Sequence, residues 1–419
     1  MKLYEHWLQV ATTDATSLAL VDMASGQRWT FAELHAQIEA TPALDTKIRD
    51  AQGRGVDFII ATVAAWRDDA ILCPCEDEET SLPARLTSSA KVSHVKRTSG
   101  STGTPRNVWF TSDQLAADAQ QIVTTMGLRK DWPNIGVISL AHSYGFSNLV
   151  LPLLLHGIPL VLVPDALPNT LRKTLDTFDH ITLPAVPAMW RAWLGAGILN
   201  KRIQLAISAG APLTLALEKA IYEQYDLKIH NFYGSSECGG IAYDRSLEPR
   251  EDPTFVGTAM DEVTLNIIDD HLQVTSPAVG LGYADDLNDP NLRNGRFLTS
   301  DHAQLRSGNA VYLQGRRGES INVAGRKVSP QIIEEALLGI PSVIHAIVFG
   351  IPSKNTERVD EIVAVIHLDH QTTLESLTKK LSLPSWQRPR HWWICKELSP
   401  DARGKISRSH WRERYLQKR

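Results

Sequence analysis

Hydrophobic and polar positions alternate through most of the first 250 residues in a way that predicts alternating strands and helices. Residues 57–75 hold two apolar stretches around a helix-like turn, and residues 135–164 alternate apolar runs with Gly and Pro. Runs of this kind fit strands that are buried on both faces of an α/β sheet. A segment of helical spacing lies at 213–225, and three more apolar runs lie at 179–186, 203–209 and 228–233. This order predicts an α/β fold.

From about residue 255 to residue 315 the pattern changes to short strands with polar turns. We find no helical spacing in this stretch. Short strands joined by polar turns are typical of a small β-rich subdomain. The fold class expected for the large N-terminal domain is therefore α/β with a β-rich subdomain.

After Gly315 the composition shifts again, which indicates a second domain. A Gly/Arg-rich turn precedes a helix expected at about 330–338, a strand pair near 343–350 and 361–368, and a basic C-terminus. These elements indicate a small α+β module of about 100 residues, within the usual size range of domains. The chain is thus expected to divide into the domains 1–315 and 316–419.

Composition and charge exclude several functional classes. The 419 residues are 43% apolar and 21% charged, and no run is long and apolar enough to span a bilayer. Lys and Arg number 43 against 47 Asp and Glu, a formal net charge of -4. Such a balance does not favour nucleic acid or an anionic membrane as the main partner. Small-molecule partners are expected instead.

The N-terminus and the cysteines favour a cytoplasmic location. The first residues carry Glu5 and Asp14 and lack the basic and apolar segments of an export signal. Cys73 and Cys75 form a C-P-C sequence, and the other two cysteines stand alone. This spacing does not match a zinc site, so reduced and partly buried thiols are expected.

The stretch from Arg97 to Arg106 (RTSGSTGTPR) is the strongest local candidate for chemistry. Glycines allow tight turns with exposed N–H groups, hydroxyls add donors, and Arg106 adds a fixed positive charge. Together these groups suit a cradle for phosphate oxygens. The stretch does not match the Walker pattern, and taken alone it is more typical of a solvated Gly/Ser/Thr turn.

This loop begins a series of motifs that extends nearly to the C-terminus. In order, the series holds TSGSTGTPR (98–106), SAGAPL (208–213), NFYGSSE (231–237), TSD (299–301), GR (315–316) with INVAGRKVSP (321–330), and GKI (404–406). The series resembles the motifs of the adenylate-forming superfamily of acyl-CoA synthetases, aryl-acid ligases, peptide-synthetase adenylation domains and luciferases. TFAEL (30–34) also resembles the opening motif of that family.

The resemblance implies an ATP-dependent acid–thiol ligase with a large N-terminal AMP-binding domain and a small mobile C-terminal domain. Such an enzyme joins a carboxylate to the α-phosphate of ATP and releases pyrophosphate. It then passes the acyl group to the thiol of coenzyme A or of a carrier-protein phosphopantetheine. Two anions meet in the first step, so charge neutralisation by Mg²⁺ and a basic side chain is the central demand.

The resemblance also implies roles for single residues. Lys405 would approach the α-phosphate and the carboxylate as a catalytic residue, and Glu237 would help to hold Mg²⁺. Asp301 would accept hydrogen bonds from the ribose hydroxyls, since a carboxylate is an acceptor only. The residues expected to bind ATP or AMP are Thr98, Ser99, Gly100, Ser101, Thr102, Gly103, Arg106, Gly210, Ala211, Pro212, Tyr233, Gly234, Ser236, Asp301 and Arg316.

Several positions depart from the family pattern. Arg106 stands where Lys is usual, Ser236 replaces Thr and Ser300 replaces Gly. Gly318 lies at the hinge, where its free backbone suits a position that changes φ and ψ, so we expect domain rotation to persist. The phosphate-loop candidate begins earlier in the chain than is usual, which implies a shortened N-terminal subdomain.

The segment AHSYGF (141–146) lies where the family places its substrate gate. The resemblance implies that His142 acts there as a gate and a neighbour of the carboxylate. The stretch lacks the Asp that pairs with an α-amino group, so an α-amino acid substrate is disfavoured. The pocket is expected to take an aryl or an acyl acid and to be lined by Tyr144, Phe146, Met189 and Trp190.

The thiol acceptor stays open between coenzyme A and a carrier protein, because both would pass phosphopantetheine along Gly325. Two further alternatives remain. One is an adenylating enzyme that stops at acyl-AMP or loads only a carrier protein. The other is a degenerate, non-catalytic nucleotide-binding protein, which the substitutions at Arg106 and Ser300 would allow.

Overall fold

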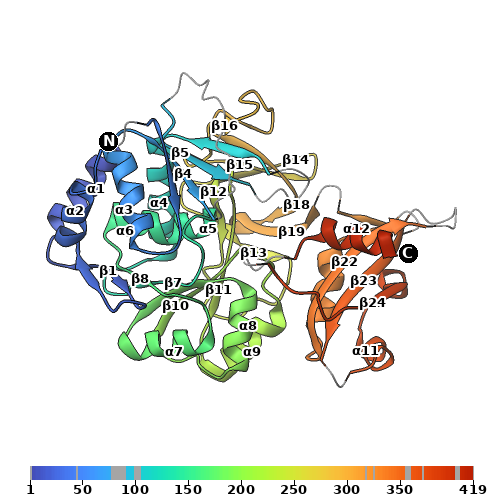
Figure 1. Ribbon diagram of the computed structural model, residues 1–419. Coiled ribbons are helices and arrows are strands. Elements are labelled where there is room, and N and C mark those ends of the chain that lie inside the picture. Colours follow the sequence, from blue (N-terminus) through green and yellow to red (C-terminus); the bar gives the residue numbers. More distant parts are fainter. Residues whose placement is uncertain are drawn as a thin grey trace.

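The computed structural model describes residues 2–43, 46–76, 91–98, 105–316, 319–323, 326–353, 360–369, 372–401 and 406–418. Figure 1 shows a large body formed by the N-terminal part of the chain and a smaller body formed by the C-terminal part. The large body has α/β layers and a β-rich portion, and the smaller one is α+β, so the expected fold class is confirmed.

One continuous sheet forms the frame of the large body. Its strands, in spatial order, are β14 (Thr264–Ile268), β15 (His271–Thr275), β18 (Arg296–Arg306), β19 (Ala310–Arg316), β13 (Phe255–Ala259), β12 (Gly239–Tyr243), β11 (Ile229–Ser235), β10 (Ile203–Ser208), β9 (Ile181–Ala185), β7 (Asn134–Gly136), β8 (Leu160–Leu162), β1 (Leu18–Asp22) and β2 (Arg28–Thr30), with β17 (Leu292–Arg293) on β18. From β1 to β11 the neighbours are parallel, and from β11 to β14 they are antiparallel. β11 therefore joins the α/β part to the β-rich part.

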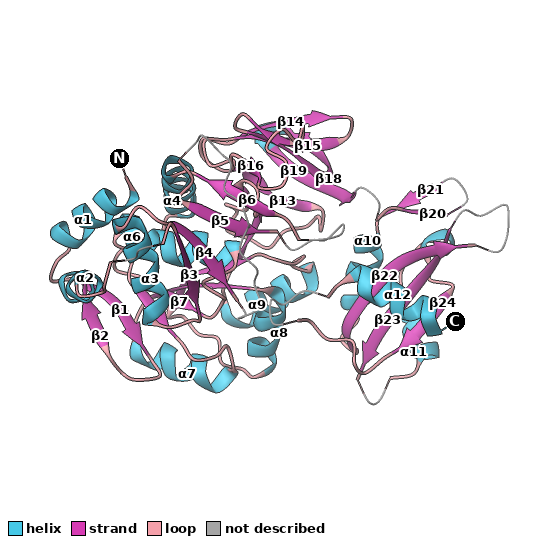
Figure 2. Cartoon of the chain, turned by 45° about the horizontal axis from the view of Figure 1, so that its top comes forward, coloured by secondary structure: helices cyan, strands magenta, loops and turns pink. Residues whose placement is uncertain are grey.

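Helices cover the parallel strands. They are α1 (Leu3–Thr13), α2 (Phe31–Glu39), α3 (Val56–Arg67), α4 (Ser112–Met126), α5 (Ser143–Gly145), the π-helical turn η1 (Phe146–Val150), α6 (Leu151–His156), α7 (Pro168–Thr177), α8 (Pro187–Gly195) and α9 (Leu215–Tyr225). A capping box between Thr30 and Glu33 explains why α2 begins where it does. In Figure 2 the helices gather around the parallel strands, whereas β14, β15, β18 and β19 form a layer of strands.

Residues 143–156 are helical, although their apolar run suggested strands. Only β7 and β8, at the two ends of the longer stretch 135–164, are strands. Residues 146–155 are all buried. A helix that is apolar on every side is a buried helix, and hydrophobic periodicity alone does not distinguish it from a buried strand.

A second sheet packs beside the first in the large body. Its strands are β16 (Gly282–Tyr283), β6 (Asn107–Phe110), β5 (His94–Arg97), β4 (Ile71–Cys75) and β3 (Ile48–Gln52). β5 and β6 form an antiparallel hairpin, and β6 also pairs with β16. The described ends of the phosphate-loop candidate, Thr98 and Arg106, therefore adjoin β5 and β6.

The C-terminal body has its own hydrophobic clusters on the two faces of a small sheet. Its elements are β20 (Ile321–Val323), β21 (Arg326–Val328), α10 (Pro330–Leu338), β22 (Val343–Pro352), β23 (Asp360–Leu368), α11 (Leu374–Lys380), η3 (Ser385–Gln387), β24 (His391–Ile394) and α12 (Arg408–Lys418). The main buried cluster of the large body ends at Val311, and the two clusters here begin at Ile321 and at Ile347. We therefore propose a domain boundary near residues 315 and 316.

Two further expectations concern the cysteines and the membrane. All four cysteines are free thiols and all are buried. Within the described ranges, the helices are too short or too polar for any of them to cross a bilayer.

Candidate functional site

The carboxyl ends of the parallel strands meet along one edge of the main sheet. β9, β10 and β11 are closely followed by 186–190, 210–212 and 236–237, which hold expected site residues. β7, in the same parallel set, leads towards His142. Open α/β sheets bind ligands at this edge. The fold thus gathers segments that are far apart in the sequence into one candidate site.

Asp301 lies at the centre of a hydrogen-bonded cluster that joins three strands. On β18 it is the direct neighbour of Arg316 on β19. Arg316 Nε donates to Asp301 Oδ1 at 2.6 Å, and the Tyr233 hydroxyl on β11 donates to Asp301 Oδ2 at 2.5 Å. The Asp301 residue is only 7% exposed. The structure therefore brings together Tyr233, Asp301 and Arg316, while their contact with a nucleotide stays a prediction.

The burial and the charges of this cluster hold the Asp301 carboxylate in place as a hydrogen-bond acceptor. Burial, together with the charge of Asp301, raises the pKa of Tyr233 well above its ordinary value, so its hydroxyl stays a donor. Burial disfavours the charge of Arg316, but the attraction of Asp301 outweighs it and raises the pKa of Arg316. Each carboxylate oxygen of Asp301 can accept a second hydrogen bond besides the one described. The cluster can therefore orient two donors of a ligand.

His142 and Ser143 lie beside the segment that follows β11. The hydroxyls of Ser143 and Ser236 are hydrogen-bonded at 2.8 Å. His142 is the N-cap residue of α5, and its Nδ1 accepts a hydrogen bond from the Tyr144 N–H at 3.3 Å. This contact places the hydrogen of a neutral imidazole on Nε2. The structure therefore brings the gate segment to Ser236, while the roles of His142 and Ser236 stay predictions.

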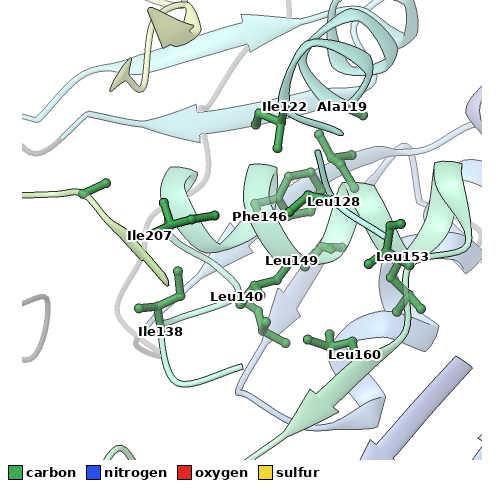
Figure 3. Close-up of a cluster of buried hydrophobic side chains, with 14 of the residues drawn as sticks. Ala119, Ile122, Leu128, Ile138, Leu140, Phe146, Leu149, Leu153, Leu160 and Ile207 are labelled. Atoms are coloured by element: carbon green, nitrogen blue, oxygen red, sulfur yellow. The ribbon is translucent and has the colours of Figure 1, made fainter. Parts of the chain in front are cut away.

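Two of the four residues expected in an acid pocket belong to the core. Phe146 and Trp190 are fully buried. Phe146 lies 4.3 Å from the ring of His94, within the cluster of Figure 3, and Trp190 packs edge-on against a neighbouring tryptophan. The helices that carry Phe146 and Trp190 turn them inward, which corrects the expectation that they line a pocket. Tyr144 and Met189 are half-buried and stay candidates.

Glycines shape two turns at the site. Gly210 has a φ of +84°, in the left-handed region that favours glycine. At Gly234, in the tight hairpin of β11 and β12, a Cβ would lie 2.6 Å from the Gly239 carbonyl oxygen. The backbone geometry therefore favours glycine at both positions. Contact of the partly exposed Gly210, Ala211 and Pro212 with a purine stays a prediction.

The described ends of the phosphate-loop candidate are paired with each other. Thr98 N donates to the Arg106 carbonyl at 2.8 Å, and Arg106 N donates to Thr98 Oγ1 at 2.9 Å. These bonds close the base of the loop. The expected residues Ser99, Gly100, Ser101, Thr102, Gly103, Gly318, Gly325 and Lys405 lie outside the described residues.

The Arg106 side chain makes contacts that the sequence did not suggest. Its Nε donates to Asp285 at 3.1 Å and its Nη1 to Asp289 at 2.8 Å. The guanidinium carbon also lies 3.5 Å from the ring centre of Tyr283. Because 179 and 183 positions separate Arg106 from the two acids, no local pattern links them. Arg106 therefore joins the base of the phosphate-loop candidate to the segment 283–289. Its role as a phosphate ligand stays a prediction.

Glu237 is the candidate metal ligand of the site. Its Oε1 accepts a hydrogen bond from the Tyr283 hydroxyl at 3.3 Å. In the part of the chain that the structure describes, no group of three or more His, Cys, Asp and Glu could hold a metal. One carboxylate together with substrate phosphate oxygens is a donor set that suits Mg²⁺. The residues present therefore fit the expected ion.

A buried charged cluster beneath the site was not predicted from the sequence. Lys96 Nζ lies 2.9 Å from Asp118 Oδ2 and 3.0 Å from Ser147 Oγ, and Ser147 donates to the same carboxylate oxygen at 2.6 Å. A Cβ at Gly239 would lie 2.1 Å from Asp118 Oδ1, so the cluster touches the β11–β12 hairpin. The three side chains come from β5, α4 and η1, and their contact depends on the tertiary fold.

Comparison with known proteins supports the resemblance found in the sequence. Residues 83–283 match the model of the AMP-binding enzyme family, which confirms the resemblance to the adenylate-forming enzymes. The chain is similar to 4-hydroxybutyrate–CoA ligase 1 of Metallosphaera sedula, with 24% identity over 82% of this chain and 66% of the relative. It is also similar to 4-chlorobenzoate–CoA ligase of Arthrobacter sp., with 24% identity over 75% and 65%. The aligned part thus falls just short of two thirds of these relatives' length.

Solved structures share the fold. ATP-bound MatB from Rhodopseudomonas palustris has a TM-score of 0.85 at 17% identity, with 99% of this chain and 98% of that chain covered. o-Succinylbenzoate CoA synthetase (MenE) from Bacillus subtilis, in complex with its acyl-adenylate intermediate, has a TM-score of 0.83 at 18% identity, with 97% of each chain covered. At this identity the likeness concerns the fold alone.

Proposed function

We propose that the protein activates a carboxylic acid with ATP as an acyl-AMP, releases pyrophosphate and transfers the acyl group to a thiol. The observation that carries the proposal is the cluster of Tyr233, Asp301 and Arg316 at the ligand-binding edge of the sheet. Ser236 and Glu237 directly follow the strand that holds Tyr233. The residues that we propose as ribose acceptor, hydroxyl donor and metal ligand therefore lie on adjoining elements.

The charges of the cluster suit a nucleotide. Asp301, held between Tyr233 and Arg316, would accept the two ribose hydroxyls, and Tyr233 would lie against the adenine. Arg316 would add positive charge near the ribose or the phosphates. Mg²⁺, held by Glu237 and the phosphates, would offset the negative charge that opposes attack by a carboxylate.

The residues of the site and the relatives favour particular classes of acid and of thiol acceptor. His142, Tyr144 and Met189 would stand nearest to the acid, which we propose to be an aryl or an acyl acid. The two relatives named above are CoA ligases, and this favours coenzyme A as the acceptor. A carrier-protein phosphopantetheine is the alternative.

The test is pyrophosphate release with ATP and Mg²⁺ across a panel of aryl, fatty and amino acids. Acid-dependent release is expected with an aryl or acyl acid. Product formation is then compared with coenzyme A and with a phosphopantetheinylated carrier protein, which separates the two acceptors. Measurable ATP binding without release for any acid would contradict the proposal and support a non-catalytic nucleotide-binding protein.

Replacing Asp301 by Asn is expected to weaken ATP binding about tenfold or more, because one charge-assisted acceptor is lost and Arg316 keeps no charged partner there. The dissociation constant for ATP, measured by calorimetry, checks this expectation. Asp261→Asn is the control, since it breaks a surface pair between Asp261 and Arg245 at 3.0 Å. Equal affinities of the wild type and Asp301→Asn would remove Asp301 from the nucleotide site.

A further inference from the structure

The ring of Tyr283 lies where two expected ATP-binding segments meet. Its hydroxyl donates to Glu237 Oε1 at 3.3 Å, and its face lies under the Arg106 guanidinium at 3.5 Å. Glu237 belongs to the turn after β11, and Arg106 to the base of the phosphate-loop candidate. Tyr283 therefore contacts both segments at once, and none of the sequence motifs pointed to it.

Backbone bonds fix the place of this ring. Leu281 N donates to the Trp109 carbonyl and Ala284 N donates to the Asn107 carbonyl, each at 2.8 Å, so the segment that holds Tyr283 is bound along β6. Gly280 N donates to the Glu237 carbonyl at 2.9 Å. The same short segment thus holds the main chain of Glu237 and, through Tyr283, its carboxylate.

Charged groups at the face of the Tyr283 ring also hold the ring in place. Arg106 is held by Asp285 and Asp289, which follow Tyr283 closely in the chain. Its guanidinium covers the ring face, in the geometry of a cation–π contact. The ring is therefore held between an ion-paired cation on its face and Glu237 at its hydroxyl, and the Tyr283 residue is only 8% exposed.

We propose that Tyr283 is a positioning residue that orients the Glu237 carboxylate towards a Mg²⁺–nucleotide. This inference rests on the proposed function. A phenol hydroxyl donates one hydrogen bond, so it fixes one oxygen of Glu237 and sets the direction of the other. Groups that orient a metal ligand in this way commonly change metal affinity about 10- to 100-fold when they are removed.

The test is Tyr283→Phe, which removes the hydroxyl and keeps the ring under Arg106. Calorimetric titration with ATP in excess Mg²⁺ is expected to give a dissociation constant about tenfold weaker than that of the wild type. Titration with ATP in EDTA is expected to give equal constants. A tenfold change only with Mg²⁺ supports positioning, whereas equal constants with Mg²⁺, or the same loss with and without Mg²⁺, would overturn it.

A double variant and a matched control complete the experiment. If Tyr283 acts through Glu237, then adding Tyr283→Phe to Glu237→Gln should cause no further loss of Mg²⁺-dependent affinity, and a further loss would contradict the inference. Tyr4→Phe removes a similar tyrosine–glutamate bond, from Tyr4 to Glu39 at 2.7 Å, on the α1–α2 surface, and should leave both titrations unchanged.

The inference can fail separately from the proposed function. A wild-type protein that binds ATP with Mg²⁺ and releases pyrophosphate, beside an unaffected Tyr283→Phe, would overturn the inference alone. A wild-type protein without Mg²⁺-dependent ATP binding would overturn both.

Discussion

Lys96→Met is expected to destabilise the large body by about 3–5 kcal/mol, because it leaves the carboxylate of Asp118 buried without its cation. Lys96, Asp118 and Ser147 are 3%, 1% and 4% exposed, so water cannot replace the lost partner. Met has nearly the same length, so it fills the same space, although it also loses the contact of the Lys96 Nζ with the Phe110 ring, 4.7 Å from the ring centre. The midpoint of urea denaturation, followed by tryptophan fluorescence, measures the effect.

Two further variants make this expectation specific to the buried charge. Lys96→Met combined with Asp118→Asn should recover part of the loss, since the carboxylate is then gone. Lys130→Met breaks the exposed pair of Lys130 and Asp14, 2.6 Å apart, and should cost about 1 kcal/mol or less. A midpoint for Lys96→Met equal to that of Lys130→Met would show that the buried pair does not support the fold.

Lys405→Ala is expected to lower acid-dependent pyrophosphate release by about 100- to 1,000-fold, the usual range for removal of one group that stabilises developing charge. The motif GKI (404–406) motivates this expectation. The described residues on either side are anchored, because Leu398 is fully buried and Arg408 is paired with Glu334. The fold should therefore tolerate the change, and the thermal midpoint should move little.

Lys418→Ala is the matched control for Lys405→Ala. Lys418 is also a basic residue of the C-terminal segment, but it lies exposed against the ring of Trp393. Its loss should leave pyrophosphate release close to that of the wild type. Wild-type release by Lys405→Ala would remove Lys405 from the reaction, whereas an equal fall in both variants would point to a general effect of positive charge.

Local sequence predicted most elements because their signals are local. The helix expected at 330–338 and the strands expected at 203–209 and 228–233 are present as α10, β10 and β11. The apolar runs at 57–67, which lies in α3, and at 143–156 are helices instead of the expected strands, and the second failure has a physical reason. A run that is buried on every side has the same apolar composition whether it is a helix or a strand, so its pattern does not distinguish the two.

The sequence likewise predicted only part of the candidate site. Motif order pointed to Tyr233, Asp301 and Arg316, and the structure brings them within hydrogen-bonding distance. The pocket assignments of Phe146 and Trp190 were wrong because side-chain type does not reveal which face of a helix is turned to the core. The sequence analysis did not identify Tyr283, because only its contacts with Glu237 and Arg106 in the folded chain mark it as a candidate.

The sequence by itself determined the alternation of strands and helices, the change to a β-rich part, and the ordered motifs that indicate an adenylate-forming enzyme. Only the tertiary structure decided that Arg106 pairs with Asp285 and Asp289, that Tyr283 reaches Glu237, and that Lys96 is buried with Asp118. Hydrophobic periodicity and turn chemistry act between residues close in the chain. Contacts between distant charged groups are fixed by how sheets and helices pack, and a single sequence does not encode them in any local pattern.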